Sequence, residues 1–321
     1  MSLKLKAERD APGLFDLKSM LTMSAISIAY LLLSWVLIGF KPTQVILVVI
    51  TNLLYFLSAP TRELVKGFSI FIIYWVIFDY MKAFPNYRYN EVHIESLYRH
   101  EKDLFGIVVN GVRLTANEYW LLHRSLFLDI AAGLFYLMWI PVPLGFSAWL
   151  FFRSRPQFYG FALTFLLVNL IGFVIYYLYP AAPPWYIQLH GTELDVLTKG
   201  NTAGLGRFDR FFHAGIFSSL YEQSSNVFAA MPSLHASYPV IVLYYGLRNR
   251  LGKVNIAFAV IMAGIWFAAV YSSHHYILDV LAGILCAVVG IGLFQLLFRK
   301  RFPLTGTAKV NVRLNAQDRT E

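Results

Sequence analysis

The sequence predicts an all-α protein that crosses a lipid bilayer about eight times. Of its 321 residues, 58% are hydrophobic and only 14% are charged, whereas about a quarter of the residues in a soluble domain are charged. Aromatic residues make up 17% of the chain, as is typical where Trp and Tyr lie at membrane interfaces. The third observation is a series of apolar runs, each near the roughly 20 residues that cross the hydrocarbon core as a helix.

Polar or basic stretches separate eight such runs. The second and third are short and close together, so the sequence leaves open whether both cross fully or form a helical hairpin. The first run is too long for a cleavable signal and lacks a small-residue cleavage site, so we expect it to remain as a membrane anchor. The runs cover residues 19–40, 43–59, 65–81, 125–146, 158–179, 227–247, 254–272 and 276–298.

The distribution of Lys and Arg predicts that both chain ends lie in the cytoplasm, because loops rich in these residues stay on that side. With this orientation every short cytoplasmic loop is basic, as at Arg62 and Lys66 or at Arg153 and Arg155. The net charge of +9 is then explained by orientation and by contact with anionic lipids. No nucleic-acid partner is expected.

Two polar motifs interrupt the apolar runs at the predicted outer face. Met231-Pro-Ser-Leu-His235 lies at the start of the sixth run, and His274-His275-Tyr-Ile-Leu-Asp279 at the start of the eighth. Residues four apart share a helix face, so Asp279 can reach His275, whereas His274 points about 100° away. A carboxylate on one imidazole nitrogen fixes the tautomer and leaves the other nitrogen free to attack. Ionisable groups in membrane segments are costly and usually functional.

Phosphoryl transfer needs a nucleophile, an acid for the leaving oxygen, and fixed positive charge on the phosphate oxygens. His275 supplies the first and His235 the second. The stretch Gly204-Leu-Gly-Arg207-Phe-Asp-Arg210 adds Arg207 and Arg210 as candidate phosphate ligands, because the guanidinium group binds phosphate oxygens in pairs. Asp209, between them, either holds Arg207 or contacts a polar headgroup.

Three further residues leave their roles open. Ser233 either orients its loop, donates to phosphate, or caps the helix before His235. His274 is interpreted as an interface or supporting residue. Asp129, close to Arg124 in sequence, either forms a structural ion pair or contacts a headgroup.

These motifs carry a resemblance to a known family. Pro-Ser-x-His235 and His275-x-x-x-Asp279 resemble the second and third signatures of the type-2 phosphatidic acid phosphatase superfamily. Within it, the chain is most similar to the inositol phosphorylceramide synthases and their bacterial relatives, across roughly residues 120–298. Three more stretches match that branch: Pro183-Pro184-Trp185-Tyr186, Ala203-Gly-Leu-Gly-Arg207-Phe-Asp209 and His274-His275-Tyr276.

Two departures from the phosphatase signatures favour transfer over hydrolysis. Ala268 and Ala269 stand where the phosphatases have Ser-Arg, and Pro183-Pro184 stands where they have basic residues. The synthase branch resembles this sequence at both places. The resemblance implies a six-helix core, a phosphohistidine-type intermediate on His275, and no metal or other cofactor. With a single cysteine in the chain, a thiolate metal site is not expected either.

The sequence therefore predicts a multi-pass membrane phosphotransferase with its active site on the non-cytoplasmic face. It would move a phosphoryl headgroup, inositol phosphate by resemblance, from a phospholipid to a lipid alcohol such as ceramide. The alternatives are a lipid phosphate or prenyl diphosphate phosphatase, and a lipid-binding or transport protein, which would need ionisable residues near the bilayer midplane. The expected parts are N-terminal membrane helices (1–81), an outer amphipathic interface segment (82–124), the catalytic core (125–298) and a basic cytoplasmic tail (299–321).

Overall fold

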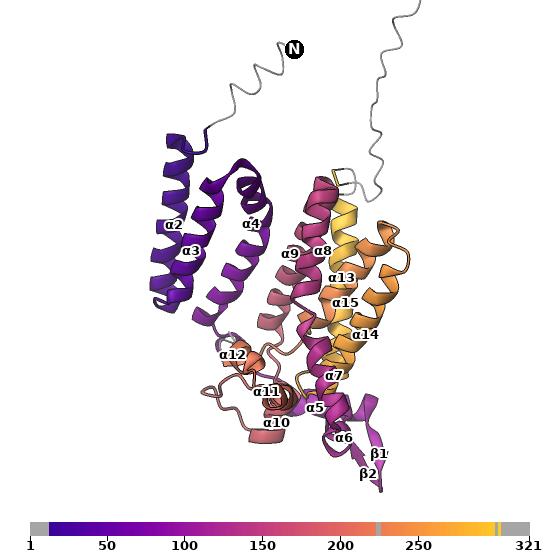
Figure 1. Cartoon of the computed structure of the whole chain (residues 1–321). Coiled ribbons are helices and arrows are strands. Elements are labelled where there is room, and N and C mark those ends of the chain that lie inside the picture. Colours follow the sequence, from indigo (N-terminus) through magenta and orange to yellow (C-terminus); the bar gives the residue numbers. More distant parts are fainter. Residues whose placement is uncertain (1–12, 223–225, 299–300, 303–321) are drawn as a thin grey trace, which may run out of the picture.

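The computed structural model describes residues 13–222, 226–298 and 301–302. The predicted basic tail therefore lies outside the described residues, apart from Arg301 and Phe302, and so do the basic residues before position 13. The described chain is mainly helical, with a single two-stranded hairpin among the described residues, and the predicted all-α membrane architecture is confirmed (Figure 1).

Three helices form an N-terminal group that stands beside the rest of the molecule (Figure 1). Asp16 caps the first, because its carboxylate accepts the N–H of Ser19 at 2.9 Å. Ser58 caps the third and exchanges hydrogen bonds with Thr61 in a capping box. The third packs against the remaining bundle, mainly through α9 (Arg155–Leu178). The helices are α2 (Leu17–Ile38), α3 (Pro42–Leu57) and α4 (Ala59–Tyr80).

The second group of helices contains both histidine motifs. The first membrane span of this group consists of two helices, because a new helix begins at Pro141. The long helix α9 packs against α8, α13, α15 and α4, and its buried face carries Phe158 and Phe161. The helices are α7 (Leu126–Leu137), α8 (Pro141–Arg153), α9 (Arg155–Leu178), α13 (Leu234–Arg248), α14 (Val254–Tyr271) and α15 (Ile277–Phe298).

Six described helical segments are long and apolar enough to cross a membrane, with α7 and α8 counted as one. The approximate count of eight is reached only with α3 and α13, which have 16 and 15 residues. The sixth predicted run, 227–247, becomes helical only at Leu234, because Pro232 and the capping Ser233 precede the helix. The third run also differs, since its helix begins at Ala59 rather than at residue 65.

The segment 82–124, expected to be an amphipathic interface segment, folds into a layer of short helices and a β-hairpin. It holds a β-hairpin whose turn, Asn110-Gly111, has positive φ angles of 51° and 80°, as the favoured two-residue hairpin turn requires. Ile107 pairs with Leu114 across the hairpin. Its elements are η1 (Met81–Ala83), η2 (Asn86–Arg88), α5 (Glu95–Phe105), β1 (Ile107–Val109), β2 (Val112–Leu114) and α6 (Ala116–Leu122).

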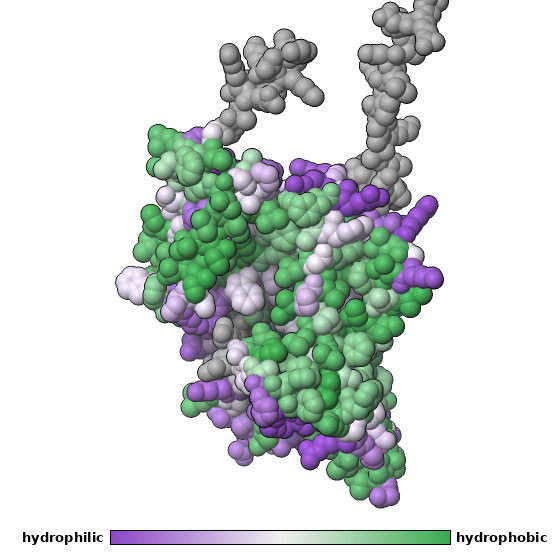
Figure 2. All heavy atoms as spheres, in the orientation of Figure 1, coloured by the Kyte–Doolittle hydropathy of each residue, from purple (hydrophilic) through white to green (hydrophobic). Residues whose placement is uncertain are grey.

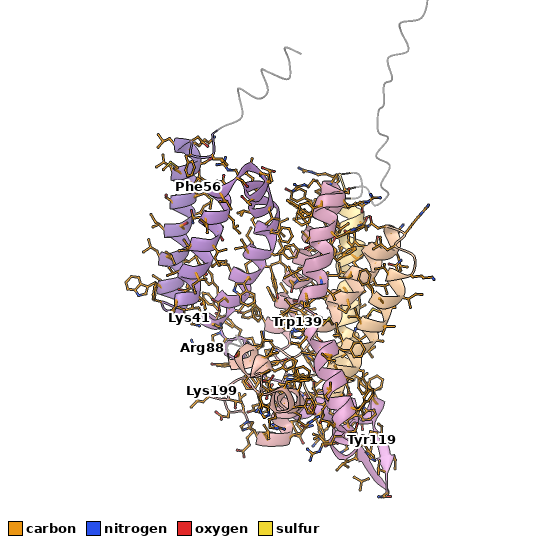
Figure 3. All side chains as sticks on the ribbon, viewed as in Figure 1. Lys41, Phe56, Arg88, Tyr119, Trp139 and Lys199 are labelled. Atoms are coloured by element: carbon orange, nitrogen blue, oxygen red, sulfur yellow. The ribbon has the colours of Figure 1, made fainter. Side chains whose placement is uncertain are left out.

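The segment between α9 and α13 lies at the same end of the molecule as α5 and α6 (Figure 1). Ala181 connects three stretches of chain there, since it forms isolated parallel bridges with His93 and with Ala229. Lys199 and Arg88, labelled in Figure 3, lie toward this end. The elements are α10 (Pro184–His190), η3 (Ala203–Leu205), α11 (Gly206–Phe212) and α12 (Ile216–Glu222).

Large apolar side chains cover the sides of the bundle, as expected for a protein surrounded by lipid. Leu285 on α15 is 62% exposed and Trp35 on α2 is 64% exposed. Figure 2 shows hydrophobic residues along the sides of the helices and hydrophilic residues gathered toward the two ends. A monomeric soluble protein rarely exposes so continuous an apolar surface.

Candidate active site

His235 lies in the first turn of α13, and Ser233 determines where that helix begins. The Ser233 hydroxyl accepts the N–H of Ala236 at 3.4 Å, and the side chain is fully buried. The Ser233 N–H donates to the carbonyl of Asp279 at 2.9 Å. Of the three roles left open for Ser233, the structure shows the helix cap.

His275 lies in the turn between α14 and α15, and Asp279 follows in the first turn of α15. Their Nδ1 and Oδ2 atoms are 3.5 Å apart, within ion-pair range but longer than the 2.7–3.2 Å of an N–H···O hydrogen bond. The same carboxylate oxygen accepts the N–H of Tyr276 at 2.8 Å. The structure thus brings together the two side chains that the four-residue spacing places on one face.

A close contact between α13 and α15 brings the two histidine motifs together. A Cβ atom added to Gly283 would lie 2.1 Å from the carbonyl oxygen of Ser233, so only glycine permits this approach. Ser237 supports the contact, because its hydroxyl donates to the Gly283 carbonyl at 2.7 Å. The rings of His235 and His275 consequently lie 5.9 Å apart, centroid to centroid.

Both histidines line one cavity of about 140 Å³. Its walls are rich in Phe, Trp and Tyr residues and include Trp139, which is labelled near the middle of the molecule in Figure 3. Helix α4 contributes Tyr74 and Phe78, so the N-terminal group forms part of the wall. The other lining residues are Trp75, Tyr176, Pro183, Trp185, Gly200, Asn201, Tyr221, Asn226, Val227, Ala229, Ala230, Leu234, Tyr238 and His274.

His235 has a partner that the sequence did not indicate. The hydroxyl of Tyr136, on α7, lies 3.1 Å from its Nδ1. The Trp139 ring lies 4.5 Å from the imidazole, centroid to centroid, edge to face. Since Tyr136 occupies Nδ1, Nε2 is the nitrogen left to meet a substrate.

His274 lines the cavity, but its side chain is bonded to the protein. Its Nε2 bonds to the carbonyl of Thr202 at 2.9 Å, and its ring stacks on Tyr221 with centroids 4.3 Å apart. Burial lowers the pKa of His274 to about 3. These contacts agree with the supporting role expected for it.

The imidazole of His275 is suited to nucleophilic attack at neutral pH. Burial lowers its pKa to about 4, because a charged ring loses solvation inside the protein. The ring therefore stays neutral and keeps a lone pair available.

Comparison with known proteins identifies the family. The PAP2 superfamily matches residues 106–293 of the chain. The chain belongs to this family. The match begins just before β1, ends within α15 and includes both histidine motifs, so the resemblance drawn from those motifs is confirmed.

The chain is also similar to curated phosphoinositol dihydroceramide and inositol phosphorylceramide synthases. A phosphoinositol dihydroceramide synthase of Bacteroides thetaiotaomicron is 46% identical over 280 residues, which is 87% of this chain and 92% of that protein. An inositol phosphorylceramide synthase of Candida albicans is 31% identical over 55% of this chain and 37% of its own length. The catalytic subunit of the inositol phosphorylceramide synthase of Saccharomyces cerevisiae is 27% identical, over 85% of this chain and 70% of its own length. No solved structure gives a significant match.

At the position of the PAP2 phosphatase Ser-Arg pair, Ala268 and Ala269 are fully buried in α14. Their backbone, rather than their side chains, serves the site. The Ala269 carbonyl accepts the N–H groups of both His274 and His275, at 3.1 and 3.0 Å. This position therefore shapes the histidine turn and offers no side chain to a phosphate.

Arg207 is held beside the histidine turn by a partner that the sequence did not assign. Its Nε donates to Asp129 at 2.6 Å, and the same carboxylate oxygen accepts the hydroxyl of Tyr271 at 2.8 Å. Asp129 thus pairs with Arg207 and not with Arg124. The Gly204 N–H donates to the carbonyl of Ser272 at 2.8 Å. This bond holds the segment that carries Arg207 against the histidine turn. The Nη2 atom of Arg207 is buried without a hydrogen-bond partner.

Asp209 does not hold Arg207, which is one of the two roles left open for it, and contact with a polar headgroup stays a prediction. Asp209 is buried, and its carboxylate accepts the N–H groups of Phe217 and Ser218 at 3.1 and 2.8 Å. Asp209 therefore connects α11 to α12 through these hydrogen bonds. Arg210 is exposed on α11, and neither arginine is among the described residues that line the cavity.

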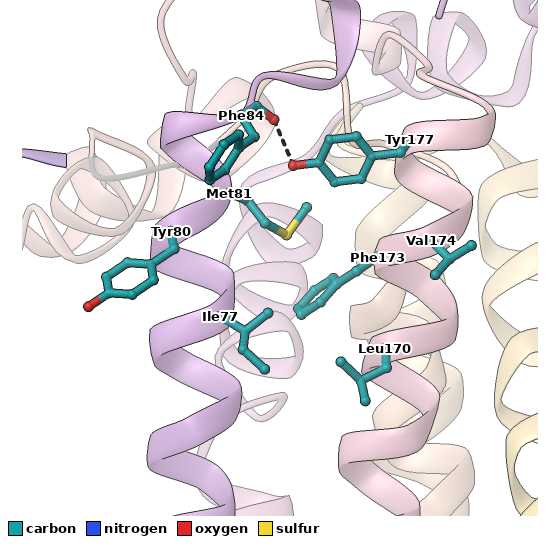
Figure 4. Close-up of a pocket in the computed structure, with 8 residues that line it drawn as sticks. All are labelled: Ile77, Tyr80, Met81, Phe84, Leu170, Phe173, Val174 and Tyr177. Atoms are coloured by element: carbon teal, nitrogen blue, oxygen red, sulfur yellow. Dashed lines mark hydrogen bonds between the residues drawn. The ribbon is translucent and has the colours of Figure 1, made fainter. Parts of the chain in front are cut away.

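A second hollow, of about 420 Å³, lies between α4 and α9 (Figure 4). Tyr177 donates to the carbonyl of Phe84 at 2.6 Å across one end of it. Phe173 lines this groove and its ring lies 6.1 Å from that of Phe78, which lines the histidine cavity. The groove is lined by Ile77, Tyr80, Met81, Phe84, Leu170, Phe173, Val174 and Tyr177.

Proposed function

We propose that the chain is an integral membrane enzyme that transfers phosphoinositol from phosphatidylinositol to the hydroxyl of ceramide or dihydroceramide. The observation that carries this proposal is the pair His235 and His275, facing one cavity with rings 5.9 Å apart. The sequence relatives support the substrate class, because the protein that is 46% identical is a phosphoinositol dihydroceramide synthase.

In the first half-reaction, the nitrogen of His275 that faces away from Asp279 attacks the donor phosphorus. The bond from phosphorus to the glycerol oxygen breaks, and His235 gives its proton to that oxygen, so diacylglycerol leaves. Asp279 stabilises the positive charge that develops on the His275 ring. The product is a phosphoinositol group bound to His275.

In the second half-reaction, the acceptor hydroxyl attacks the same phosphorus. His235, now without its proton, takes the hydroxyl proton, and the bond between phosphorus and His275 breaks. Both histidines return to their starting states and the headgroup has moved to the acceptor. Arg207 is a proposed charge partner for the phosphate oxygens, because one of its nitrogens is unpaired beside the histidine turn.

The dimensions of the cavity suit the reacting phosphate rather than whole lipids. A volume of about 140 Å³ is small beside the ~300–1,000 Å³ of typical ligand sites. The acyl chains therefore stay in the surrounding bilayer. We place the site at the non-cytoplasmic face, since the short loops at the opposite end are basic.

The test uses the purified full-length chain with phosphatidylinositol labelled in the inositol ring, with and without dihydroceramide. We expect a labelled sphingolipid that forms only when the acceptor is present, and none with His275→Ala. If labelled inositol phosphate is released at the same rate without any lipid alcohol, the enzyme is a hydrolase and the proposal is wrong.

A further inference from the structure

The turn that carries His275 is held from outside by two buried polar side chains of the 82–124 layer. The amide of Asn117, on α6, donates one hydrogen to the carbonyl of Val270 at 2.8 Å and the other to the carbonyl of His275 at 2.9 Å. It joins the end of α14 to the backbone of His275 itself. Asn117 is fully buried.

Glu101, on α5, holds the other side of the same turn. One carboxylate oxygen accepts the N–H of Ile277 at 2.9 Å, and the other accepts the N–H of Leu278 at 3.0 Å. The first N–H groups of a helix lack partners within the helix, and a carboxylate there is also favoured by the helix dipole. Glu101 therefore caps α15 from a helix 176 residues earlier in the chain.

The burial of Glu101 points to a purpose beyond helix capping. The residue is fully buried, and a buried carboxylate is costly unless it is paired. No described Lys or Arg forms an ion pair with it, so the two backbone N–H groups are its described partners. Burial raises the pKa of Glu101. A Ser or Asp residue immediately before α15 would cap the helix without burying a carboxylate from another helix.

We propose that Glu101 and Asn117 are positioning residues that hold His275 and Asp279 in the geometry needed for phosphoryl transfer. Together they fix the backbone on both sides of His275, and Asp279 follows one residue after the second N–H that Glu101 binds. Neither residue lines the cavity, so they act through the turn and not on a substrate. Glu101 precedes the part of the chain that matches the PAP2 superfamily. The inference rests on the proposed catalytic role of His275.

The two substitutions Glu101→Gln and Asn117→Asp test the proposal. Glu101→Gln keeps one acceptor oxygen and turns an amide donor toward a backbone N–H. Asn117→Asp replaces the two donated hydrogens with an oxygen that faces two carbonyls. Displacement of a reacting group by about 1 Å lowers the rate about a hundredfold. We expect kcat to fall at least about tenfold in each variant, with KM for both lipids unchanged within about twofold.

Glu118→Gln is the matched control. Glu118 belongs to the same layer and accepts from the Thr115 N–H and the Tyr98 hydroxyl at 2.7 Å each, without contacting the histidine turn. It is expected to keep kcat. The double variant of Glu101 and Asn117 should lose less than the product of the two single losses, because both act on one turn. Glu101→Ala should lose more than Glu101→Gln.

Three outcomes overturn the proposal. They are folded variants with wild-type kcat, a rise in KM without loss of kcat, and a failure of both variants to fold, which would assign the pair a purely structural role. Each variant is compared with the wild type on the same lipids. If the wild type rejects ceramide but uses another acceptor, the proposed substrate is wrong while the ratio of kcat values still tests the positioning role.

Discussion

The hydroxyl of Tyr136 lies 3.1 Å from Nδ1 of His235, and this contact bears on which nitrogen carries the ring proton. With the hydroxyl donating to Nδ1, the proton of the neutral ring lies on Nε2, the nitrogen that is left to face the leaving oxygen. Tyr136 comes from α7 and His235 from α13. The acid of the proposed mechanism is therefore prepared by a helix that carries neither histidine motif.

Tyr136→Phe tests this relationship. Loss of the donated hydrogen lets the ring proton move to Nδ1, so we expect kcat to fall about tenfold or more, because general acid catalysis contributes about 10²–10⁴-fold. Tyr245→Phe is the control, since its hydroxyl bonds to Thr164 at 2.8 Å away from the cavity. Equal kcat values in the two variants would contradict the assigned tautomer.

The neighbouring histidines should differ sharply when each is replaced. His275→Ala removes the proposed nucleophile and should abolish turnover. His274→Ala should leave measurable activity, since its ring is bound to Thr202 and Tyr221. Steady-state transfer rates of variants with a normal size-exclusion profile make the comparison. The reverse ranking would move the nucleophile to His274.

Asp279→Asn keeps the shape of the side chain and removes its charge. The corresponding change in a serine protease triad lowers kcat about 10⁴-fold, so we expect a loss of several orders of magnitude. The measurement is a single-turnover assay with labelled donor. Near-normal turnover in folded protein would show that the contact between His275 and Asp279 is structural.

The pH dependence of kcat/KM should reflect the buried state of His275. With its pKa lowered to about 4, the neutral nucleophile persists as the pH falls from 7 to 5, whereas an imidazole with the usual pKa of about 6.5 would be only roughly 3% neutral at pH 5. We expect kcat/KM to change by less than about twofold over this interval.

A control for unfolding accompanies the pH measurement. A histidine with a lowered pKa in the folded state destabilises the fold as the pH falls below the unfolded value, because the unfolded chain then binds more protons. Activity is therefore measured at pH 7 after incubation at pH 5. A reversible fall of kcat/KM with a midpoint near 6.5 would contradict the neutral nucleophile.

Cysteine labelling tests the orientation of the chain. Leu197, between α10 and η3, is 84% exposed, and Val254, at the opposite end of the bundle, is 50% exposed. In a protein whose buried Cys286 is replaced by alanine, an impermeant maleimide should label Leu197→Cys from the outer side and Val254→Cys only after the membrane is opened. The opposite pattern would place the site in the cytoplasm.

The sequence predicted the membrane helices and the pairing of His275 with Asp279 because both are local signals. A run of apolar residues determines a crossing, and a spacing of four determines a shared helix face. The hairpin at Asn110-Gly111 also had a local signal, the dipeptide itself, which the interpretation of 82–124 as an amphipathic interface segment did not use.

The partners of the histidine turn had no such signal. Glu101, Asn117 and Tyr136 reach the two motifs across 176, 158 and 99 residues, and each is an ordinary residue in its own stretch. Asp129 was likewise assigned to Arg124 by closeness in sequence, while its partner lies 78 residues away. Contacts of this kind depend on how helices pack, which hydrophobic periodicity alone does not determine.

The close approach at Gly283 has a consequence for how this enzyme can diversify. Because backbone meets backbone there, the gap between the two histidines does not depend on the size of any side chain in the cavity wall. A wall residue such as Phe78, which lines the cavity from α4, can change to admit a different headgroup while the atoms that make and break the phosphorus bond keep their spacing. Residues of the cavity wall can thus determine the substrate, while the backbone contact at Gly283 determines the spacing of the reacting groups.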